Sequence, residues 1–207
     1  AGGGGGEAAR VERCVGEAGP SGGGDDDPVR SRGVMEHGCS HYRRRARLVA
    51  PCCGELFWCR HCHNASKSGP GSGLDVSSWH QLDRSKVKEL ECAVCGTRQA
   101  VAESCAKCGV AFGRYTCLTC VFFDDDTSKG QYHCDKCGIC RAGGRSNFFH
   151  CDRCGCCYST SLRHNHRCVE GSMKQDCPVC QEYLFDSVRP ICVMRCGHTI
   201  HDECFAE

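Results

Sequence analysis

Large apolar side chains are scarce in this sequence of 207 residues. Eight Phe, five Tyr and two Trp are too few to build a hydrophobic core that orders more than roughly 150 residues. No stretch approaches the roughly 20 consecutive apolar residues of a membrane-spanning helix, so we expect no membrane partner. The formal net charge is only +1, which gives no bulk reason to expect nucleic-acid or membrane binding. The chain therefore needs another source of folding energy.

Cysteine and histidine are abundant instead, with 25 cysteines and 11 histidines. Such density is typical either of a secreted disulfide framework or of zinc-binding modules. No apolar signal segment opens the chain, the number of cysteines is odd, and histidines stand at ligand spacing around the thiols, which together favour zinc. A structural zinc ion contributes roughly 10–16 kcal/mol in small fingers, enough to replace a missing core. We therefore expect zinc modules in a reducing compartment, the cytoplasm or the nucleus.

The densest run of ligands lies in the second half of the chain, where HCDKCGIC is followed by FFHCDRCGCC and HNHRC. Each C-x-x-C turn aims two thiolates at one ion, and zinc takes four such ligands in a tetrahedron. Cys156 and His164 are alternatives to neighbouring ligands in this run. The central block offers enough ligands for three closed sites: Cys117, Cys120, His133, Cys134, Cys137, Cys140, His150, Cys151, Cys154, Cys157, His166 and Cys168.

An earlier block begins with Cys39-x-His41 and contains the adjacent pair Cys52 and Cys53. This pair indicates two zinc ions sharing one segment, because neighbouring cysteines rarely bond to each other. His80, beyond a Gly/Ser/Pro-rich insert, is the candidate for the last ligand of this pair of sites. A four-cysteine site of ribbon type follows, with Gly96 and Gly109 at positions where the turn needs a positive φ. The ligands predicted in this block are Cys39, His41, Cys52, Cys53, Cys59, Cys62, His63, His80, Cys92, Cys95, Cys105 and Cys108.

The last block has the order C-x-x-C, C-x-H, H-x-x-C, which is typical of the first three-quarters of a cross-braced double zinc site. In that topology Cys177 and Cys180 close one site with His201 and Cys204. The remaining pair, Cys196 and His198, forms half of a second site. The whole chain thus predicts about seven zinc ions. The expected fold class is small zinc-stabilised modules in tandem, with little regular secondary structure and with short hairpins and short helices around multiple zinc sites.

Four segments outside the ligand pattern carry their own expectations. Residues 1–36 are Gly-rich and charged and should be disordered, with Cys14 as an unliganded thiol. The polar segment LDRSKVKELE is compatible with a helix that buries Leu82, Val87 and Leu90. A basic cluster and an acidic run are each interpreted as solvated, although the basic cluster could also aid nuclear import or contact phosphate. These are Arg43, Arg44, Arg45 and Arg47, and Asp124, Asp125 and Asp126.

The order of these motifs resembles the RING finger and CHY zinc finger domain-containing family of E3 ubiquitin-protein ligases. CxH, CC, CxxCH, H, CxxC, CxxC is similar to a CHY-type finger, and CxxC, HCxxCxxC, HCxxCxxC, HxC is similar to a CTCHY-type finger. The final block resembles a RING finger that lacks its last two ligands. The resemblance implies a CHY-type finger over 37–111 and a CTCHY-type finger over 112–176, each with three zinc ions, and an incomplete RING over 177–207.

The same resemblance implies function. The N-terminal fingers would recruit a protein substrate such as a transcription factor, and the RING would bind a ubiquitin-conjugating enzyme and so act with ubiquitin. Val179 and Ile200 would belong to the apolar surface that docks this enzyme. Zinc would be purely structural, with no catalytic residue in the chain, and the location would be nucleus and cytoplasm.

Two other functions compete with this interpretation. A zinc-scaffolded binding module could bind partners without transferring ubiquitin, because half a RING site is missing. Nucleic-acid binding would need a basic face with interleaved aromatic residues, which the sequence does not display beyond the arginine cluster, so it is disfavoured. A covalent thioester mechanism, which is disfavoured too, would have to use a cysteine outside the ligand sets: Cys14, Cys156 or Cys192.

Overall fold

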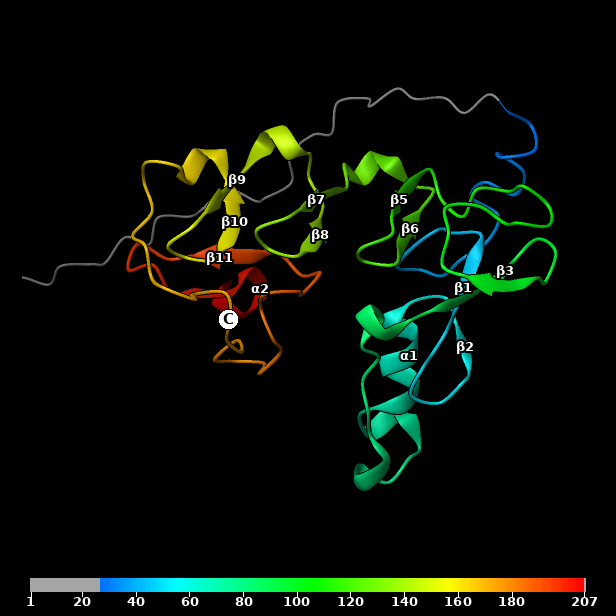
Figure 1. Ribbon diagram of the computed structural model, residues 1–207. Coiled ribbons are helices and arrows are strands. Elements are labelled where there is room, and N and C mark those ends of the chain that lie inside the picture. The colour runs from blue at the N-terminus through cyan, green and yellow to red at the C-terminus, as the bar shows by residue number, and fades with distance from the viewer. Residues whose placement is uncertain (1–26, 207) are drawn as a thin grey trace, which may run out of the picture. The chain divides into compact units, whose positions relative to one another are not determined.

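The computed structural model describes residues 27–206, which divide into two compact units at residues 128 and 129. The elements are short in both units (Figure 1), which confirms the predicted fold class. The first unit holds β1 (Ala46–Val49), β2 (Leu56–Phe57), α1 (Arg60–Lys67), η1 (Pro70–Ser72), η2 (Val76–Ser78), η3 (Arg84–Lys86), β3 (Glu89–Cys92), β4 (Arg98–Ala100), β5 (Tyr115–Cys117) and β6 (Phe122–Asp124). The turn η4 (Thr127–Lys129) includes the border between the units. The second unit holds β7 (Tyr132–Cys134), β8 (Ile139–Arg141), η5 (Arg145–Asn147), β9 (Phe148–Cys151), β10 (Cys156–Ser159), η6 (Thr160–Leu162), β11 (Ile191–Val193), β12 (Thr199–His201) and α2 (Asp202–Ala206).

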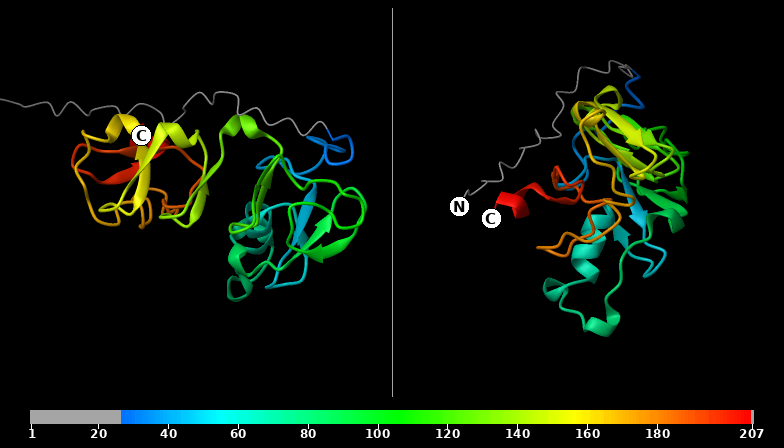
Figure 2. Two further views of the ribbon diagram at one scale, coloured as in Figure 1. Left: turned by 45° about the horizontal axis from the view of Figure 1, so that its top comes forward. Right: turned by 90° about the vertical axis from the view of Figure 1, so that its left-hand side faces the viewer.

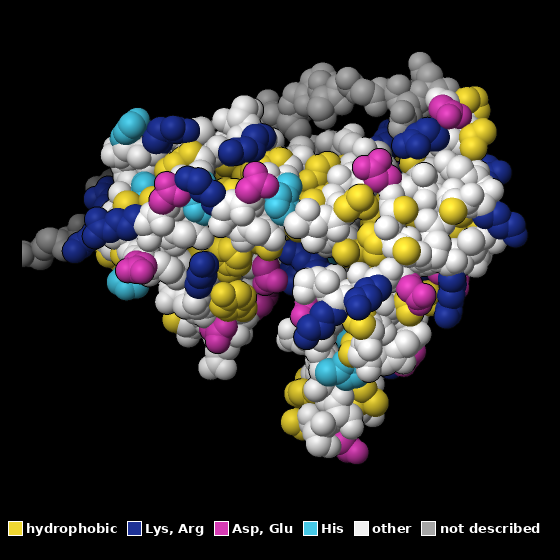
Figure 3. All heavy atoms as spheres, in the orientation of Figure 1, with side chains coloured by type: hydrophobic (Ala, Val, Ile, Leu, Met, Phe, Trp, Pro, Cys, Tyr) yellow, Lys and Arg dark blue, Asp and Glu magenta, His cyan; other side chains and the backbone are white. Residues whose placement is uncertain are grey.

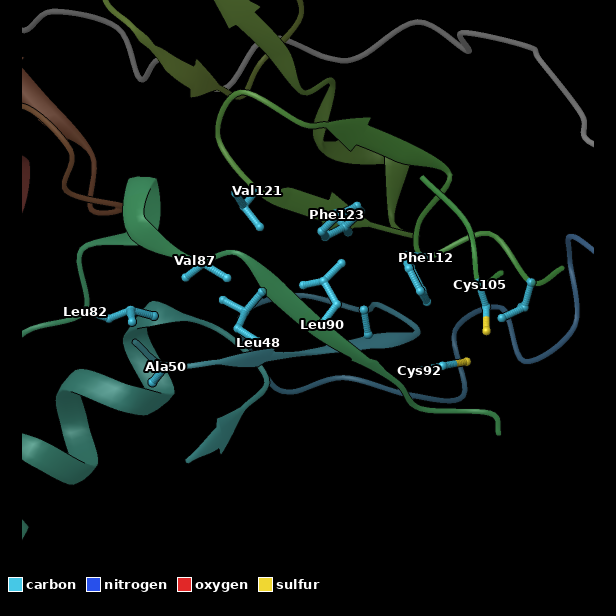
Figure 4. Close-up of a cluster of buried hydrophobic side chains, with 12 residues drawn as sticks. Leu48, Ala50, Leu82, Val87, Leu90, Cys92, Cys105, Phe112, Val121 and Phe123 are labelled. Carbon is cyan, nitrogen blue, oxygen red and sulfur yellow. The ribbon is translucent and has the colours of Figure 1, made fainter. Parts of the chain in front are cut away.

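An antiparallel sheet of order β2-β1-β3-β4 forms the frame of the first unit. Leu48 on β1 pairs with Leu90 on β3, and both side chains are buried. The hairpin β5–β6 adds Phe123 to the same core, where its ring meets that of Phe112 edge to face at 5.8 Å (Figure 4). This cluster of buried side chains is the largest apolar core in the described residues. It is small, as the scarcity of large apolar residues predicts.

The segment LDRSKVKELE is not a helix, so the helical prediction is wrong. It forms the single turn η3 and then strand β3, which pairs with β1 on one side and β4 on the other. Strand pairing on both sides overrides the helix propensity of Lys and Glu, which is weak compared with tertiary packing. Leu82, Val87 and Leu90 are buried as predicted.

The middle of the basic cluster and the start of the acidic run are buried, which corrects the solvated interpretation for these residues, whereas Arg43 is exposed as expected. Arg44 and Arg45 are only 2% and 1% exposed, and Asp124 and Asp125 are buried as well. Arg45 Nη2 donates to Asp125 Oδ1 at 2.7 Å, and the backbone N–H of Arg43 donates to Asp124 Oδ1 at 3.1 Å. Each run supplies the counter-charges and hydrogen bonds that the other needs in order to be buried.

Residues 27–36 are ordered, which corrects the prediction of a disordered tail for this part of it. The carbonyl of Arg30 accepts hydrogen bonds from Arg45 Nη1 and from the backbone N–H of Ala111. The N–H of Met35 donates to Asp125 Oδ2 at 3.2 Å. The segment is therefore fixed by the same buried charges. The expectations for residues 1–26, Cys14 among them, fall outside the described residues.

Antiparallel hairpins build the second unit: β7–β8, β9–β10 and β11–β12. Tyr158 on β10 and Val193 on β11 share one buried cluster with Met173, so the β9–β10 and β11–β12 hairpins lie against each other (Figure 2). The Tyr158 hydroxyl lies 2.6 Å from Ser172 Oγ, which keeps the buried phenol hydrogen-bonded. No helix among residues 27–206 is long and apolar enough to cross a membrane.

Candidate zinc centres

Distances between thiols separate a zinc site from a disulfide. Zinc–sulfur bonds of about 2.3 Å in a tetrahedron place two sulfurs about 3.8 Å apart, whereas a disulfide holds them about 2.05 Å apart. All 24 described cysteines are free thiols. In seven groups of Cys, His or acidic side chains in the described residues, the ligand atoms all lie within 4.8 Å of one another. The donors are sulfur and imidazole nitrogen, which suits zinc, so the chain binds multiple zinc ions.

The first cluster joins Cys39 and His41 to the start of α1. Cys59 caps the helix, its sulfur accepting the N–H of Cys62 at 3.5 Å, so that both thiols of this C-x-x-C turn face one point. The sulfur of Cys59 lies 3.7 Å from that of Cys39 and 3.6 Å from that of Cys62. His41 Nδ1 lies 3.7 Å from the sulfurs of both Cys39 and Cys59. These are the edges of a zinc tetrahedron.

The second cluster brings His80, the candidate for the last ligand of this block, to Cys52, Cys53 and His63, a grouping that the spacing left open. His63 Nε2 lies 3.1 Å from the sulfur of Cys52, and its Nδ1 lies 3.0 Å from Asn64 Oδ1, which also accepts the N–H of Leu82. His80 Nδ1 donates to the carbonyl of Ser78 at 2.9 Å, whereas its Nε2 is buried without a hydrogen-bond partner. A buried nitrogen aimed at two thiols and otherwise unsatisfied fits a metal ligand.

The four-cysteine cluster of Cys92, Cys95, Cys105 and Cys108 has sulfur–sulfur edges of 3.7 Å (Cys92 to Cys108) and 3.5 Å (Cys95 to Cys105). The hydroxyl of Thr97, 3.2 Å from the sulfur of Cys95, is the main cause that lowers the pKa of that thiol to about 6. Burial raises the pKa of Cys92 to about 12. The cluster therefore holds at least one thiolate at neutral pH, and zinc displaces a proton from Cys92.

In the second unit, Cys134, Cys137, His150 and Cys157 form a cluster between two hairpins. The sulfur of Cys157 lies 3.4 Å from that of Cys134 and 3.6 Å from that of Cys137, and Cys137 lies 3.2 Å from His150 Nδ1. The hydrogen bond from the Cys157 thiol is the main cause that lowers the pKa of Cys137 to about 4. The structure thus places Cys157 in the cluster, whereas Cys156 is fully buried in the apolar core.

A neighbouring set comprises Cys151, Cys154, His166 and Cys168. His166 Nε2 lies 3.4 Å from the sulfur of Cys151 and 3.3 Å from that of Cys168, and these two sulfurs are 3.7 Å apart. His166 Nδ1 donates to the carbonyl of Leu162 at 2.7 Å, which fixes the ring with Nε2 toward the thiols. His164, the alternative ligand, is exposed.

The C-terminal set comprises Cys177, Cys180, His201 and Cys204. His201 Nδ1 lies 3.2 Å from the sulfur of Cys180, and its Nε2 lies 3.0 Å from the hydroxyl of Ser187. The other predicted pair, Cys196 Sγ and His198 Nδ1, is 3.4 Å apart and exposed. The last four predicted ligands sit on hairpins, with Cys117 and Cys120 on β5–β6 in the first unit and His133 and Cys140 on β7–β8 in the second. His133 Nδ1 lies 3.8 Å from the sulfur of Cys140.

The backbone of the C-x-x-C turns explains the glycines that follow them. Gly96 and Gly109 both have φ of +72°, as predicted. Val121 and Gln181 occupy the equivalent place after Cys120 and Cys180, and they adopt φ of +47° and +57°. A side chain in this left-handed region is strained, most of all a β-branched one. The turn geometry is therefore imposed by the ligands even where glycine is absent.

Several residues that support the clusters were not singled out from the sequence. Arg189 Nη1 lies 3.2 Å from the sulfur of Cys180, and its Nη2 lies 3.6 Å from that of Cys204. The same guanidinium pairs with Glu182 at 3.3 Å and Glu203 at 2.9 Å. These carboxylates and thiolates together raise the pKa of Arg189, the Glu203 hydrogen bond most of all. A zinc ion held by three thiolates and one neutral imidazole has a net charge of −1, which the positive charge of this arginine offsets.

The two residues predicted to dock a conjugating enzyme differ in exposure. Val179 is 52% exposed in the turn between Cys177 and Cys180. Ile200 is 7% exposed, because it packs with Leu184 and Cys192 in the core of the C-terminal hairpin. Of the two, Val179 offers surface to a partner, and Ile200 supports the hairpin from within.

Comparison with known proteins decides the family. A family model described as CHY zinc finger matches residues 39–115. A rice protein, "E3 ubiquitin-protein ligase SRFP1" of Oryza sativa subsp. japonica, is 54% identical over 183 residues, which cover 88% of this chain and 67% of the relative. The chain belongs to the RING finger and CHY zinc finger family. A second rice member, "Probable E3 ubiquitin-protein ligase RZFP34", is 53% identical over 88% of this chain and 60% of its own length.

A further member of this family, "E3 ubiquitin-protein ligase RZFP34" of Arabidopsis thaliana, is 56% identical over 83% of this chain. The match covers 58% of the Arabidopsis protein. The chain therefore spans between 58% and 67% of the length of these three curated relatives. The similarity to these relatives extends over 83–88% of this chain, well beyond residues 39–115, which the CHY zinc finger model matches.

Proposed function

We propose that this chain belongs to a RING-type E3 ubiquitin-protein ligase. The observation that carries the proposal is its 54% identity, over 88% of its length, to a rice protein named as such a ligase. A ligase of this type has no nucleophile of its own. It holds the ubiquitin-loaded conjugating enzyme so that the thioester faces a substrate lysine, which is catalysis by positioning. The protein would act in the nucleus and cytoplasm.

The zinc clusters support a positioning role rather than a chemical one. Each described tetrad is closed by four protein ligands, whereas a catalytic zinc keeps one position open for water. The two described cysteines outside the ligand sets, Cys156 and Cys192, are 0% and 4% exposed, so neither thiol is accessible to a ubiquitin thioester. The Cys and His residues predicted as ligands would therefore hold zinc for structure alone.

We assign the docking of the conjugating enzyme to the turn that carries Val179. Its exposed side chain lies in the C-x-x-C turn between the predicted ligands Cys177 and Cys180, and Arg189 Nη1 lies 3.2 Å from the sulfur of Cys180. An exposed apolar side chain on a rigid turn suits a small, transient interface. The preceding fingers, predicted over residues 37–176, would recruit the substrate.

The decisive experiment is discharge of ubiquitin from a loaded conjugating enzyme onto free lysine, which needs no substrate protein. We expect the zinc-loaded chain to accelerate discharge, and Val179→Arg to reduce that acceleration roughly tenfold by placing a charge in the apolar contact. Val76→Arg, at a valine that is 71% exposed in the first unit, is the matched control and should leave the rate unchanged. Equal rates for both variants and the parent would overturn the assignment.

A zinc-scaffolded binding module remains the second candidate. It is favoured by Cys196 and His198, which stand as an exposed pair rather than a tetrad within residues 27–206. If the chain binds the conjugating enzyme or substrate yet gives no discharge above background, the binding module is the better description of this chain.

A further inference from the structure

The net charge of +1 conceals a strong asymmetry within the second unit. Residues 129–168 contain seven Lys or Arg and only two acidic side chains, both Asp, whereas residues 169–206 contain three Lys or Arg and six acidic side chains. Positive charge is thus concentrated on the part built by β7 to η6. Figure 3 shows Lys and Arg side chains over this part, with hydrophobic side chains between them.

Part of this charge lines an open groove of about 370 Å³ beside β9. Lys136, Arg145 and Arg163 supply the cations, and Phe148 and Phe149 supply aromatic surface. We call these five residues the β9 groove. All five lie in the second unit. Interleaved aromatic and basic side chains, which were not apparent from the sequence, are therefore present here.

The two arginines of the groove are oriented but not neutralised. The Arg163 guanidinium lies 5.0 Å from the centre of the Phe149 ring, and that of Arg145 lies 5.5 Å from the centre of the Tyr132 ring. Arg145 Nη1 also donates to the carbonyl of Phe148 at 3.4 Å. Among the described residues, neither arginine has an acidic partner. Stacking on a ring holds a guanidinium in place while its edge donors stay available for a ligand.

Lys136 and the two aspartates limit what the groove can accept. Lys136 Nζ pairs with Asp152 at 2.6 Å, and Asp135 lies on the groove wall. The pairing leaves two arginines as the unpaired cations of the groove, too few to neutralise the continuous line of phosphates that a nucleic acid presents. A peptide can instead place its carboxylates at the two arginines and an apolar side chain between them, against the aromatic rings.

We propose that the β9 groove binds an acidic peptide segment that contains an aromatic or aliphatic residue. Carboxylates of the segment pair with Arg145 and Arg163, and its apolar side chain packs on Phe149. The role of this segment as part of a protein to be ubiquitinated rests on the proposed ligase function. Binding of the peptide in the groove does not depend on that function.

The test is fluorescence anisotropy of a labelled acidic peptide, EFEELE, titrated with the zinc-loaded full chain. We expect binding that weakens with salt, and a roughly tenfold or greater rise in Kd for the double variant Arg145→Glu with Arg163→Glu, because two attractive pairs become repulsive. The matched control is Arg195→Glu, an exposed arginine of the same unit that does not line the groove, and it should leave Kd unchanged.

Three outcomes would overturn the proposal: no binding of EFEELE at millimolar protein, equal binding of the basic peptide KFKKLK, or tighter binding of single-stranded DNA than of the peptide. Zinc content of each variant is measured in parallel. If the double variant loses zinc, Arg145→Lys with Arg163→Lys replaces it, and this variant should bind EFEELE more weakly than the parent because lysine lacks the guanidinium fork. Unchanged binding in the lysine variant overturns the proposal too.

Ubiquitin discharge onto free lysine separates this inference from the ligase function. Loss of peptide binding in the glutamate variant with unchanged discharge supports the groove as a recruiting surface. Peptide binding without any discharge by the parent chain would contradict the ligase function and leave the groove standing. Discharge by the parent chain without peptide binding would support the ligase function and overturn the proposal for the β9 groove.

Discussion

Replacing Asp125 with asparagine tests whether one buried ion pair holds the first unit together. Asp125 Oδ1 accepts from Arg45 Nη2 at 2.7 Å and from the N–H of Arg114 at 3.1 Å, and Oδ2 accepts from the N–H of Met35 at 3.2 Å. The two charged side chains are 1% and 0% exposed. Asparagine keeps the volume of the aspartate side chain but removes its negative charge. Its NH₂ group would also face a hydrogen-bond donor where the carboxylate oxygen now accepts.

The expected loss follows from burial. Removing one partner of a buried pair leaves an uncompensated charge and destabilises a protein by about 3–5 kcal/mol. An exposed pair is screened by water and adds little stability, so Asp83→Asn, at the exposed 3.3 Å contact with Lys86, is the matched control. The double variant Arg45→Met with Asp125→Leu should lose less than the sum of the single changes, because no charge is left buried.

Urea unfolding in a fixed zinc buffer measures these differences. Trp58 and Trp79 are the only two tryptophans, and both lie in the first unit, so their fluorescence reports on that unit alone. We expect a large fall in the unfolding midpoint for Asp125→Asn and almost none for Asp83→Asn. A free-energy change below about 1 kcal/mol for Asp125→Asn would refute the reasoning.

Three further predictions concern the zinc clusters. Arg189→Met should speed zinc transfer to a chromogenic chelator, since an anionic cluster loses its counter-charge, whereas Arg195→Met should not. Gln181→Gly should stabilise the second unit by about 1 kcal/mol in thermal unfolding, because it relieves a φ of +57° at an exposed position; a fall in stability would contradict the strain. The pKa of Cys95 is lowered to about 6, so its thiolate is present above that pH and is lost as the pH falls through it. Thr97→Val should raise this pKa and shift acid-induced zinc release to higher pH. An unchanged release curve would count against the hydrogen bond between Thr97 and Cys95.

Ligand spacing was the strongest signal in the sequence, because a C-x-x-C turn constrains its own geometry whatever the rest of the chain does. It also predicted His80, which the structure brings to Cys52, Cys53 and His63 across the insert. The choice between Cys156 and Cys157 was not accessible in this way. It depends on the register of β9 and β10, where Cys157 pairs with His150 and the neighbouring side chain turns to the other face, into the core.

Charged runs were the weakest signal, for a physical reason. Arg45 and Asp125 are 80 residues apart in sequence, and each looks solvated until the other is brought beside it. Composition favours exposure for single charged residues, since burial of an unpaired charge is costly. Only the pairing of β5–β6 with the core of the first unit reveals that these charges neutralise each other. The aromatic and basic residues of the β9 groove were missed for the same reason, because separate elements assemble them.

The central claim is that zinc replaces the hydrophobic core, and native mass spectrometry of the purified chain tests it most directly. Seven groups of ligands in the described residues predict seven bound zinc ions, with the thiols reduced. Three or fewer ions, or a mass lowered by the loss of hydrogens that marks disulfide bonds, would contradict the account.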